Sequence, residues 1–387
     1  MTQLGSLRLL RVIQVLHHSL GHVYPKAEPE SGAEGWHELV AREIAKRTQE
    51  ITLECWRPES SVDEAHVWTD SYNVTHRVYP SLRVRYGIEL CIPLIDAFRR
   101  TVKNDGPVLL HLHGLFNLNT YLLAFTFGHK VPIVAQSHDP TYPAHERFPR
   151  IRNSLRRLAL REVDRFFLST ETEAREFSDV CDLDKTRVVP MPVDMKVFRK
   201  MDKRIARMKL GWKRQDRYVV YVGRLEERKG LRYLIQASRI LSSRFPNLHL
   251  VAVGSGALAN ESANNITFVG RVRYEELPTY YNAADICVLP SYRESWGRVV
   301  LESLACQTPV IATWTGCVPT LMKEGVEGLF IVPVRNSIAL ADRISEVLPE
   351  SDSLRNKIKS SKLEKYDSEC FVRRILANFK ELADRYC

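Results

Sequence analysis

Several features that would assign the chain to a specialised class of protein are missing from its 387 residues. Its eight cysteines are scattered and none belongs to a Cys-x-x-Cys pair, which argues against a zinc site or a disulfide framework and for a reducing cytoplasm. No apolar run approaches the roughly 18 residues that a membrane-spanning helix needs. Arg8 and Arg11 interrupt the first apolar stretch and no small-residue cleavage site follows, so we expect no signal peptide. These absences predict a cytoplasmic protein that does not cross a membrane.

Signatures of several binding chemistries are missing as well. No Gly-x-Gly-x-x-Gly opens a helix after the first strand, which argues against a dinucleotide-dependent oxidoreductase. No nucleic-acid-binding module is recognisable, so we expect no nucleic-acid partner. His17, His18 and His22 form a small cluster, but no cysteine or carboxylate pattern accompanies them and we predict no metal site.

What is present is the composition of an ordinary globular protein, with a length that predicts two or three domains. The net charge of +10 is concentrated in the second half, because 24 Lys/Arg oppose 25 Asp/Glu in residues 1–195 but 32 oppose 21 in residues 196–387. One basic cluster covers residues 203–214. It could attract nucleotide phosphates or anionic lipid, but a solvated helix face is the commoner outcome of such a run.

The most informative stretch contains the pattern strand, loop, helix, strand. Residues 286–289 form an apolar run that ends at Pro290, Glu294 lies in the polar loop that follows, residues 297–305 have helical spacing, and residues 309–312 are the next apolar run. This is the repeating unit of a parallel α/β sheet, in which ligands bind at the carboxyl ends of strands. The pattern therefore predicts a binding site around Glu294.

Two carboxylates in this stretch could bind hydroxyl groups. Glu294 lies in the loop and Glu302 in the helix, and each can accept hydrogen bonds from a polyhydroxylated ligand. The backbone N–H groups around Trp296, Gly297 and Arg298 open the helix and can face an anion. From the spacing alone, Glu302 could equally well be a ligand-binding carboxylate or a solvated helix residue, because Glu is common on helices.

The string P-S-Y-R-E-S-W-G-R-V-V-L-E-S-L-A-C-Q-T-P-V-I-A closely resembles the signature of the large retaining glycosyltransferase family 4, which has the GT-B fold. The resemblance runs through the whole carboxyl half. It implies that Glu294 contacts hydroxyls of a donor sugar and that Glu302 contacts the ribose of its nucleotide.

A second motif follows the apolar run at residues 218–222. Gly223 permits a tight turn, and Arg224 and Lys229 can reach a diphosphate, although a charged surface loop would have the same composition. The segment resembles the family's V-G-R-L…K-G motif, whose Arg and Lys hold the diphosphate. The turn at Gly254 is non-specific alone, and the resemblance implies that the backbone of Arg271 and Val272 pairs with the nucleotide base.

In the amino half, the apolar run at residues 107–111 leads to His113. A lone histidine at a strand end is usually structural, but the segment resembles the family's His-x-His stretch, which implies that His113 contacts the donor sugar near its reacting carbon. Residues 131–135 form another predicted strand, which brings His138 and its two neighbours to the same edge. The loop containing Gly32 corresponds to a glycine pair that the family often has near the donor.

Residues 147–161 read as a basic amphipathic helix with Ile151, Leu155 and Leu158 on one side and five arginines around them. Such a helix can dock on an anionic membrane surface, but packing of its apolar stripe on its own domain is the commoner outcome, and we favour it. Helical spacing also predicts helices over residues 88–102, 171–179, 337–348, 352–366 and 371–386.

The resemblance implies two Rossmann-like, doubly wound α/β domains that face a cleft. Residues 1–195 would form the acceptor side, residues 196–365 the nucleotide-sugar side, and residues 366–387 a helix that crosses back to the first domain. The expected reaction transfers a sugar from a UDP- or GDP-sugar to a glycan, lipid-linked or small-molecule acceptor, with retained configuration and no required cofactor. The residues that we expect to act in it are His113, Arg224, Lys229 and Glu294.

Two other classes of function stay open at this point. The same fold serves nucleotide-sugar epimerases and hydrolases, and the chain could also be a non-catalytic nucleotide-sugar-binding subunit. The sequence predicts neither the base, the sugar and the acceptor nor the oligomeric state, and it allows a peripheral contact with the inner face of a membrane.

Overall fold

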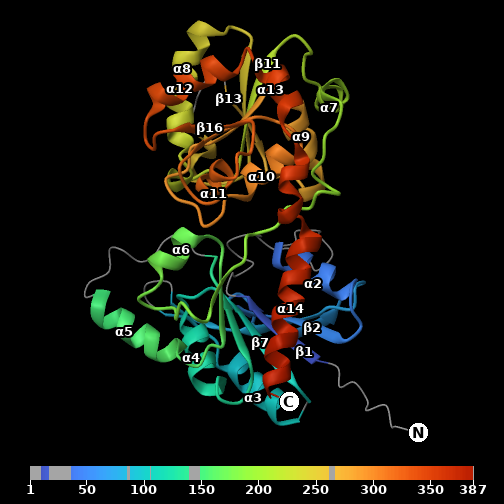
Figure 1. Cartoon of the computed structure of the whole chain (residues 1–387), viewed down its shortest axis with the longest axis vertical. Helices are drawn as coiled ribbons and strands as arrows, with labels where there is room; N and C mark the ends of the chain where they lie inside the picture. Colours follow the sequence, from blue (N-terminus) through green and yellow to red (C-terminus); the bar gives the residue numbers. More distant parts are fainter. Residues whose placement is uncertain are drawn as a thin grey trace. The chain divides into compact units, whose positions relative to one another are not determined.

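The computed structural model describes residues 10–16, 36–84, 88–104, 106–138, 149–260 and 266–386. It divides the chain into two compact units (Figure 1). The first contains residues 1–189 and 371–387, and the second contains residues 190–370. The sequence-based expectation places these divisions at residues 195 and 365 instead.

The first unit is built on an eight-stranded sheet with the strand order β10-β9-β8-β7-β1-β2-β4-β3. Neighbouring strands run parallel except for β3, which pairs antiparallel with β4 at one edge. A separate antiparallel hairpin consists of β5 and β6. The strands are β1 (Leu10–Leu16), β2 (Ile51–Glu59), β3 (His66–Thr69), β4 (Thr75–Pro80), β5 (Leu82–Val84), β6 (Ile88–Leu90), β7 (Val108–His113), β8 (Ile133–Gln136), β9 (Arg165–Leu168) and β10 (Thr186–Val188).

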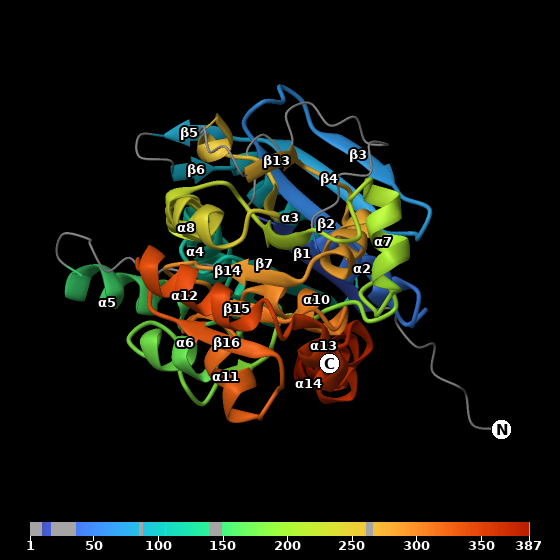
Figure 2. The same ribbon diagram turned by 90° about the horizontal axis from the view of Figure 1, so that it is seen from above.

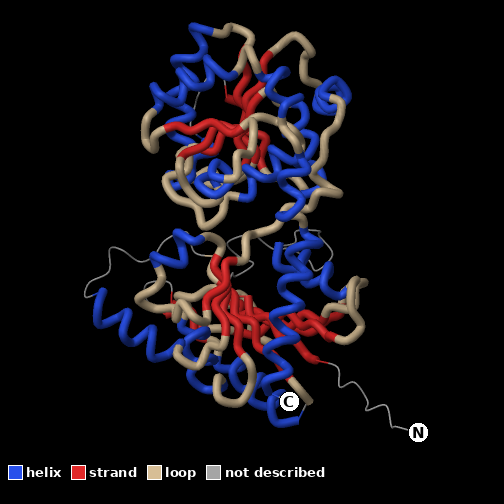
Figure 3. Tube along the Cα trace, viewed as in Figure 1, coloured by secondary structure: helices blue, strands red, loops and turns tan. Residues whose placement is uncertain are grey.

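Helices cover both faces of this sheet (Figure 3). Because successive side chains of a strand point to opposite faces, Ile13 of β1 joins a core with α3 and α4, whereas Val12 joins a core with α2 and α14. Burial on both faces explains why these strands read as nearly continuous apolar runs. The helices are α2 (Trp36–Ala45), α3 (Ile92–Asn104), α4 (Leu118–Phe127), α5 (Pro149–Leu160), α6 (Glu171–Glu176) and α14 (Ser368–Tyr386).

Most of α14 belongs to the first unit, although it lies at the other end of the chain. Its apolar residues recur every three or four positions and are buried in the core that contains Val12. Arg165 of β9 fixes the helix further, because its two Nη atoms each donate to an oxygen of Glu381 at 2.9 Å and Nη1 also donates to Asn378 Oδ1 at 2.6 Å. The predicted crossing of the terminal helix to the first unit is therefore confirmed.

The second unit is built on a six-stranded parallel sheet with the order β13-β12-β11-β14-β15-β16. On one face α8 and α12 pack side by side, as Figures 1 and 2 both show. The strands are β11 (Arg217–Val222), β12 (Leu248–Val253), β13 (Ile266–Gly270), β14 (Ile286–Leu289), β15 (Val310–Thr313) and β16 (Leu329–Val332). The helices are α7 (Lys203–Leu210), α8 (Leu231–Arg244), α9 (Leu277–Ala283), α10 (Arg298–Ala305), α11 (Val318–Lys323), α12 (Ser337–Val347) and α13 (Ser351–Lys357).

Each sheet has one point where the strand order reverses. In the first unit this point lies between β1 and β7, and in the second it lies between β11 and β14. Loops that leave the carboxyl ends of two such strands turn to opposite faces of the sheet, and ligands of doubly wound folds bind in the crevice that results. The loops after β7, β11 and β14 are therefore the places to look for a site.

Several sequence-based elements are wrong in extent. Residues 88–90 form β6 rather than the start of a helix, and α3 begins only at Ile92, because Pro93 has no N–H to donate and fits the first turn. The helix expected over residues 352–366 is divided: α13 ends at Lys357, Ile358 is extended and buried, and Ser360–Tyr366 is a 3₁₀ segment. The helix expected over residues 171–179 ends at Glu176.

The basic cluster at residues 203–214 is not simply a solvated face. Lys203 and Arg207 of α7 turn inward and bind the two oxygens of Asp285, at 2.5 and 2.8 Å. Asp285 is almost completely buried, so these cations neutralise a carboxylate that would otherwise destabilise the fold. Other members, such as Arg204, are exposed.

The structure also contradicts the packing that we favour for the basic amphipathic helix. In α5, Leu155 is 62% exposed and Leu158 is 48% exposed, whereas Asn153, Arg156 and Leu160 are buried. The side chain of Ile151 lies outside the described residues. The apolar stripe therefore does not cover its own unit. No helix in the described part of the chain has the length and apolar content that crossing a membrane requires.

Candidate functional site

Two charged side chains meet where the strand order of the second unit reverses. Lys229 lies in the 3₁₀ turn after β11, and Glu294 lies in the loop after β14. Lys229 Nζ is 2.7 Å from both Oε1 and Oε2 of Glu294, and Ser291 Oγ donates to Oε1 at 2.7 Å. The Glu294 side chain is only 6% exposed. The structure thus joins two of the residues that the sequence singles out.

A close backbone approach brings this pair together. Gly230 has φ +71°, and a Cβ atom there would lie 1.9 Å from the carbonyl oxygen of Pro290 at the end of β14. Only glycine allows this approach without displacing the backbone. Beside it, the N–H of Tyr292 donates to the carbonyl of Arg228 at 2.9 Å, and Arg228 Nη1 donates to the carbonyl of Arg293 at 3.1 Å. The turn after β11 is therefore fastened to the loop after β14.

Burial and the Glu294 carboxylate act in opposite directions on the charge of Lys229. Burial lowers the pKa of Lys229, and Glu294 opposes this effect without cancelling it. Arg224 lies earlier in the same turn but does not contact the pair. Its side chain is 67% exposed, and its Nη2 lies 3.3 Å from Glu226 Oε1. Its exposure leaves Arg224 able to reach an incoming anion.

Glu302 belongs to a second cluster on α10. Tyr281 OH donates to its Oε2 at 2.8 Å, and Arg298 Nη2 lies 3.2 Å from its Oε1. The residue is only 4% exposed, so the alternative of a solvated helix residue is wrong. Burial opposes the charge on Arg298, but Tyr274 and Glu302 outweigh it and hold the pKa of the guanidinium above its ordinary value. The pKa of Tyr281 is also raised, first by burial and then by Glu302.

The loop that opens α10 is ordered by its contacts with the next loop. Trp296 is buried, its carbonyl accepts from the N–H of Cys317 at 2.6 Å, and its ring lies 5.6 Å from that of Tyr366. Within the described residues its indole N–H has no acceptor. Gly297 follows in a left-handed conformation and precedes the first helical residue, Arg298, so the free N–H groups of the first turn begin here.

The glycines at the neighbouring strand ends form a continuous edge. The N–H of Gly223 donates to the carbonyl of Val253 at 3.0 Å, and that of Gly254 donates to the carbonyl of Gly270 at 2.7 Å. A Cβ atom on Gly254 would lie 1.9 Å from the Gly223 carbonyl oxygen. Arg271 and Val272 leave this edge directly after Gly270, so the predicted backbone contacts of the second unit share one side of its sheet.

In the first unit, His113 ends β7 next to the point where the strand order reverses. It is buried, and its Nδ1 lies 2.9 Å from Nε2 of His138, which follows β8. The ring centroids are 5.1 Å apart and the ring planes differ by 10°. A centroid separation of 5.1 Å is close to the maximum for two imidazole rings whose nitrogens are 2.9 Å apart. The hydrogen bond therefore lies nearly on the line that joins the two ring centres.

One histidine in this strand is part of the core. His111 packs against the rings of Phe167 and Phe379, and burial lowers its pKa to about 3. The remaining predicted residues of the first unit lie outside the described residues: Gly32, Asp139 and the histidines at positions 17, 18 and 22. Within the described ranges, no three His, Cys, Asp or Glu side chains are grouped to hold a metal ion.

Three contributors to the site are not predicted from the sequence. Ser291 holds Glu294, and Tyr274 and Tyr281 hold Arg298 and Glu302. Two features of the sequence could have predicted them. Ser291 comes directly after a strand end, and the two tyrosines are seven residues apart, which puts them on one side of a helical segment.

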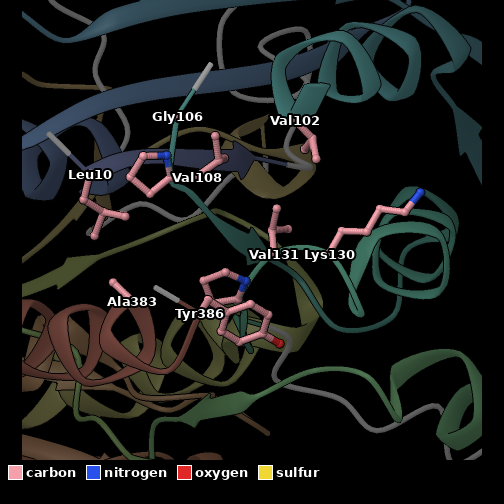
Figure 4. A pocket seen from close by; sticks show the side chains of 10 residues that line it. Leu10, Val102, Gly106, Val108, Lys130, Val131, Ala383 and Tyr386 are labelled. Carbon is pink, nitrogen blue, oxygen red and sulfur yellow. The ribbon is translucent and has the colours of Figure 1, made fainter. Parts of the chain in front are cut away.

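A cavity of about 490 Å³ lies at the opposite edge of the first sheet (Figure 4). It is lined by Leu10 and Val108 at the amino ends of β1 and β7, by Pro132 before β8, and by Ala383 and Tyr386 of α14. Ligands of such sheets bind at the carboxyl ends of the strands, so this cavity is not part of the candidate site.

Two family descriptions match the chain. Glycosyltransferase family 4 matches residues 31–197, and glycosyl transferases group 1 matches residues 202–364. The chain belongs to the family 4 glycosyltransferases of the GT-B fold.

Individual relatives agree with this family. A D-inositol 3-phosphate glycosyltransferase from Mycobacteroides abscessus is 33% identical over 203 residues, which are 48% of this chain and 45% of that relative, so the match spans less than half of either protein. Sucrose-phosphate synthase from Thermosynechococcus elongatus has a TM-score of 0.76 at 21% identity, over 96% of this chain and 99% of that one. Anabaena HepE in complex with UDP-glucose has a TM-score of 0.68 at 18% identity, over 96% and 100%. At these identities the two structures show the fold of the chain alone.

Proposed function

We propose that this glycosyltransferase moves a sugar from a nucleoside-diphosphate-sugar to an acceptor hydroxyl, with retained configuration. The observation that carries the proposal is the Lys229–Glu294 pair at the point where the strand order of the second unit reverses. A buried cation beside a carboxylate that can accept from hydroxyls suits a ligand in which a diphosphate adjoins a sugar.

Each residue has a distinct role in the proposed reaction. Arg224 and Lys229 bind the diphosphate and stabilise the charge that develops on it as it leaves, which is usually the largest contribution in such reactions. Glu294 accepts hydrogen bonds from the sugar hydroxyls and Glu302 from the ribose. His113 contacts the sugar near its reacting carbon, and the leaving phosphate takes the acceptor proton.

The pair also suits an exchange of partners on donor binding. A bound diphosphate offers Lys229 a new counter-charge, while sugar hydroxyls offer Glu294 new hydrogen-bond donors. Neither charged group is then left buried without a partner, which in proteins costs about 3–5 kcal/mol. Before binding, Lys229 and Glu294 are therefore partners of each other, and in the proposed bound state their partners are the diphosphate and the sugar hydroxyls.

The proposal extends to the donor, the acceptor and the location. Arg224 and Lys229 supply positive charge, so the reaction as proposed requires no cofactor or divalent cation. We infer a UDP- or GDP-sugar as donor, and the HepE structures, which contain UDP and UDP-glucose, support the first of these. The acceptor would be a glycan, a lipid-linked molecule or a small molecule, in the cytoplasm or at the inner face of a membrane.

Two other functions are compatible with the same donor site. A nucleotide-sugar epimerase or hydrolase would turn over the donor without any acceptor, whereas a non-catalytic subunit would bind it without turnover. Transfer is favoured because a single chain carries His113 together with Arg224, Lys229, Glu294 and Glu302.

A calorimetric binding screen with UDP, GDP, ADP and inorganic phosphate tests the donor site. We expect selective binding of one diphosphate and its loss in the Arg224→Ala, Lys229→Ala double variant. The matched control is Arg204→Ala with Lys209→Ala, which removes the same two charges from exposed positions of α7. If the folded protein binds none of the three nucleoside diphosphates, the transferase proposal is overturned.

A further inference from the structure

The outward face of α5 in the first unit is apolar. Leu155 and Leu158 are three residues apart, so they lie on the same side of the helix, and both are exposed. The buried residues Asn153, Arg156 and Leu160 lie on the opposite side, where Arg156 stacks over the ring of Phe116 at 5.1 Å. The helix is therefore held to its unit by its mostly polar side, while the apolar side faces solvent.

Figures 1 and 2 show α5 at the periphery of the first unit, with α4 beside it. This stripe of two exposed leucines keeps apolar area in water, and covering that area would be favourable. We infer that another surface covers it.

The charge around the stripe indicates what that surface is. Residues 149–161 contain five arginines and no Asp or Glu, although residues 1–195 as a whole are almost balanced with 24 basic and 25 acidic side chains. Arg157 lies next to Leu158 and is exposed. Arg161 pairs with Glu162 at 2.8 Å and Arg156 is buried, so among the arginines whose side chains the structure describes, Arg157 supplies the exposed basic charge beside the stripe.

We propose that α5 docks on the surface of an anionic phospholipid bilayer, with Leu155 and Leu158 inserted among the acyl chains near the headgroups and the neighbouring arginines bound to phosphates. Helices with an apolar stripe, a basic border and few acidic residues bind in this interfacial orientation. The proposal concerns docking alone and does not depend on the transfer reaction, because it rests on residues that have no part in the donor site.

Vesicle co-sedimentation of the full chain tests this proposal. The wild type should sediment with phosphatidylglycerol vesicles, only weakly with phosphatidylcholine vesicles, and less at 0.5 M NaCl, because salt screens the arginines. Leu155→Glu with Leu158→Glu should lower binding at least tenfold. Arg157→Gln should lower it about fivefold, which corresponds to about 1 kcal/mol per basic residue near the surface.

The matched control is Leu82→Glu with Leu183→Glu, which introduces the same charges at two exposed leucines of the same unit. It should bind like the wild type. Equal binding by the α5 variant, or an equal loss in the control, would overturn the proposal, as would a wild type that ignores anionic vesicles. Sedimentation velocity without lipid separates a further outcome: a dimer that the α5 substitutions abolish would make the stripe an interface between copies and overturn the membrane assignment.

Thermal unfolding of each variant by circular dichroism shows whether it is folded, and exposed positions give no reason for a loss of stability. Diphosphate binding, measured without vesicles, should be unchanged in both leucine variants. Failure of membrane docking and failure of the donor site are thereby distinguished.

Discussion

Lys229 Nζ lies 2.7 Å from both carboxylate oxygens of Glu294, so one ion pair joins two residues that are 65 positions apart and belong to the loops after two different strands. Both side chains are largely buried. Burial and, to a smaller extent, the charges of Arg228 and Arg224 lower the pKa of Lys229, whereas Glu294 raises it. Glu294 therefore favours the charged form of the lysine, which is the form that attracts a diphosphate. In the proposed donor site the carboxylate thus has a second role besides contact with the sugar, because it favours the charged lysine.

Glu294→Gln should make diphosphate binding more sensitive to pH. A lysine with a lowered pKa is charged below that pKa and loses its charge as the pH rises through it, and loss of Glu294 lowers the pKa further. The affinity for UDP should therefore begin to fall at a lower pH than in the wild type when calorimetry is repeated from pH 6 to 10. Glu227→Gln, which removes an exposed carboxylate from the same turn, should leave the profile unchanged. Superimposable profiles for Glu294→Gln and the wild type would contradict this role.

Gly230→Ala should displace Lys229 and destabilise the second unit. The new Cβ would lie 1.9 Å from the Pro290 carbonyl oxygen, and the positive φ adds strain. We expect a loss of about 2–4 kcal/mol in the free energy of unfolding and weaker UDP binding. Gly211→Ala is a close control, since Gly211 has φ +68° but nothing within 4 Å of its Cβ position. It should lose about 1 kcal/mol from the backbone alone and bind UDP normally, and equal losses in the two variants would refute the steric explanation.

Tyr281→Phe should destabilise the second unit through Glu302. The phenol donates to Oε2 of this buried carboxylate at 2.8 Å, and its removal leaves that oxygen without the donor. A buried acceptor that loses its partner costs about 1–3 kcal/mol, which chemical denaturation measures. The adjacent Tyr280→Phe removes the same hydroxyl from a half-buried position and should change stability by less than about 0.5 kcal/mol. A Tyr281→Phe variant as stable as the wild type would show that Arg298 alone satisfies Glu302.

The α/β plan and most strand ends are readable from the sequence, because strands buried on both faces appear as short apolar runs followed by turn residues. The residues of the candidate site are predicted from the resemblance, but their pairing is not. Neither the contact between Lys229 and Glu294 nor that between Tyr281 and Glu302 has a local signal, since each depends on how non-consecutive segments pack. Sequence periodicity predicts which side chains share a face of a helix or strand, but it does not predict which residues from distant segments contact one another.

The errors have physical causes of the same kind. In α5 the spacing of Leu155 and Leu158 correctly predicts a common face, but a periodic pattern does not say which face meets the core, and here a face with Asn153 and Arg156 does. The helix α4 (Leu118–Phe127) is apolar on almost every side, so it lacks the contrast that reveals an amphipathic helix. The strands β5 and β6 are only three residues long, too short for an alternation to be recognised.

His138→Phe should slow the proposed transfer while leaving diphosphate binding intact. The nearly in-line hydrogen bond between His138 Nε2 and His113 Nδ1 fixes the orientation and the tautomer of His113, whereas the diphosphate residues belong to the second unit. We expect at least a tenfold lower turnover of donor and acceptor at unchanged UDP affinity. His138→Gln places an amide near the same position and should restore part of the rate. Equal rates in the Phe and Gln variants would show that the hydrogen bond does not matter.

His111 should make the stability of the first unit depend on pH. Its pKa is about 3 in the folded protein and about 6.5 when unfolded, because burial disfavours the charged ring. Between these values the unfolded state binds a proton that the folded state does not, so folding becomes less favourable as the pH falls, by about 1.4 kcal/mol per pH unit below pH 6. His111→Gln should remove this contribution. In urea unfolding at pH 7, 6 and 5, the free-energy difference between wild type and variant should shrink as the pH falls. A difference that stays constant with pH would mean that His111 is protonated, or neutral, to the same extent in both states.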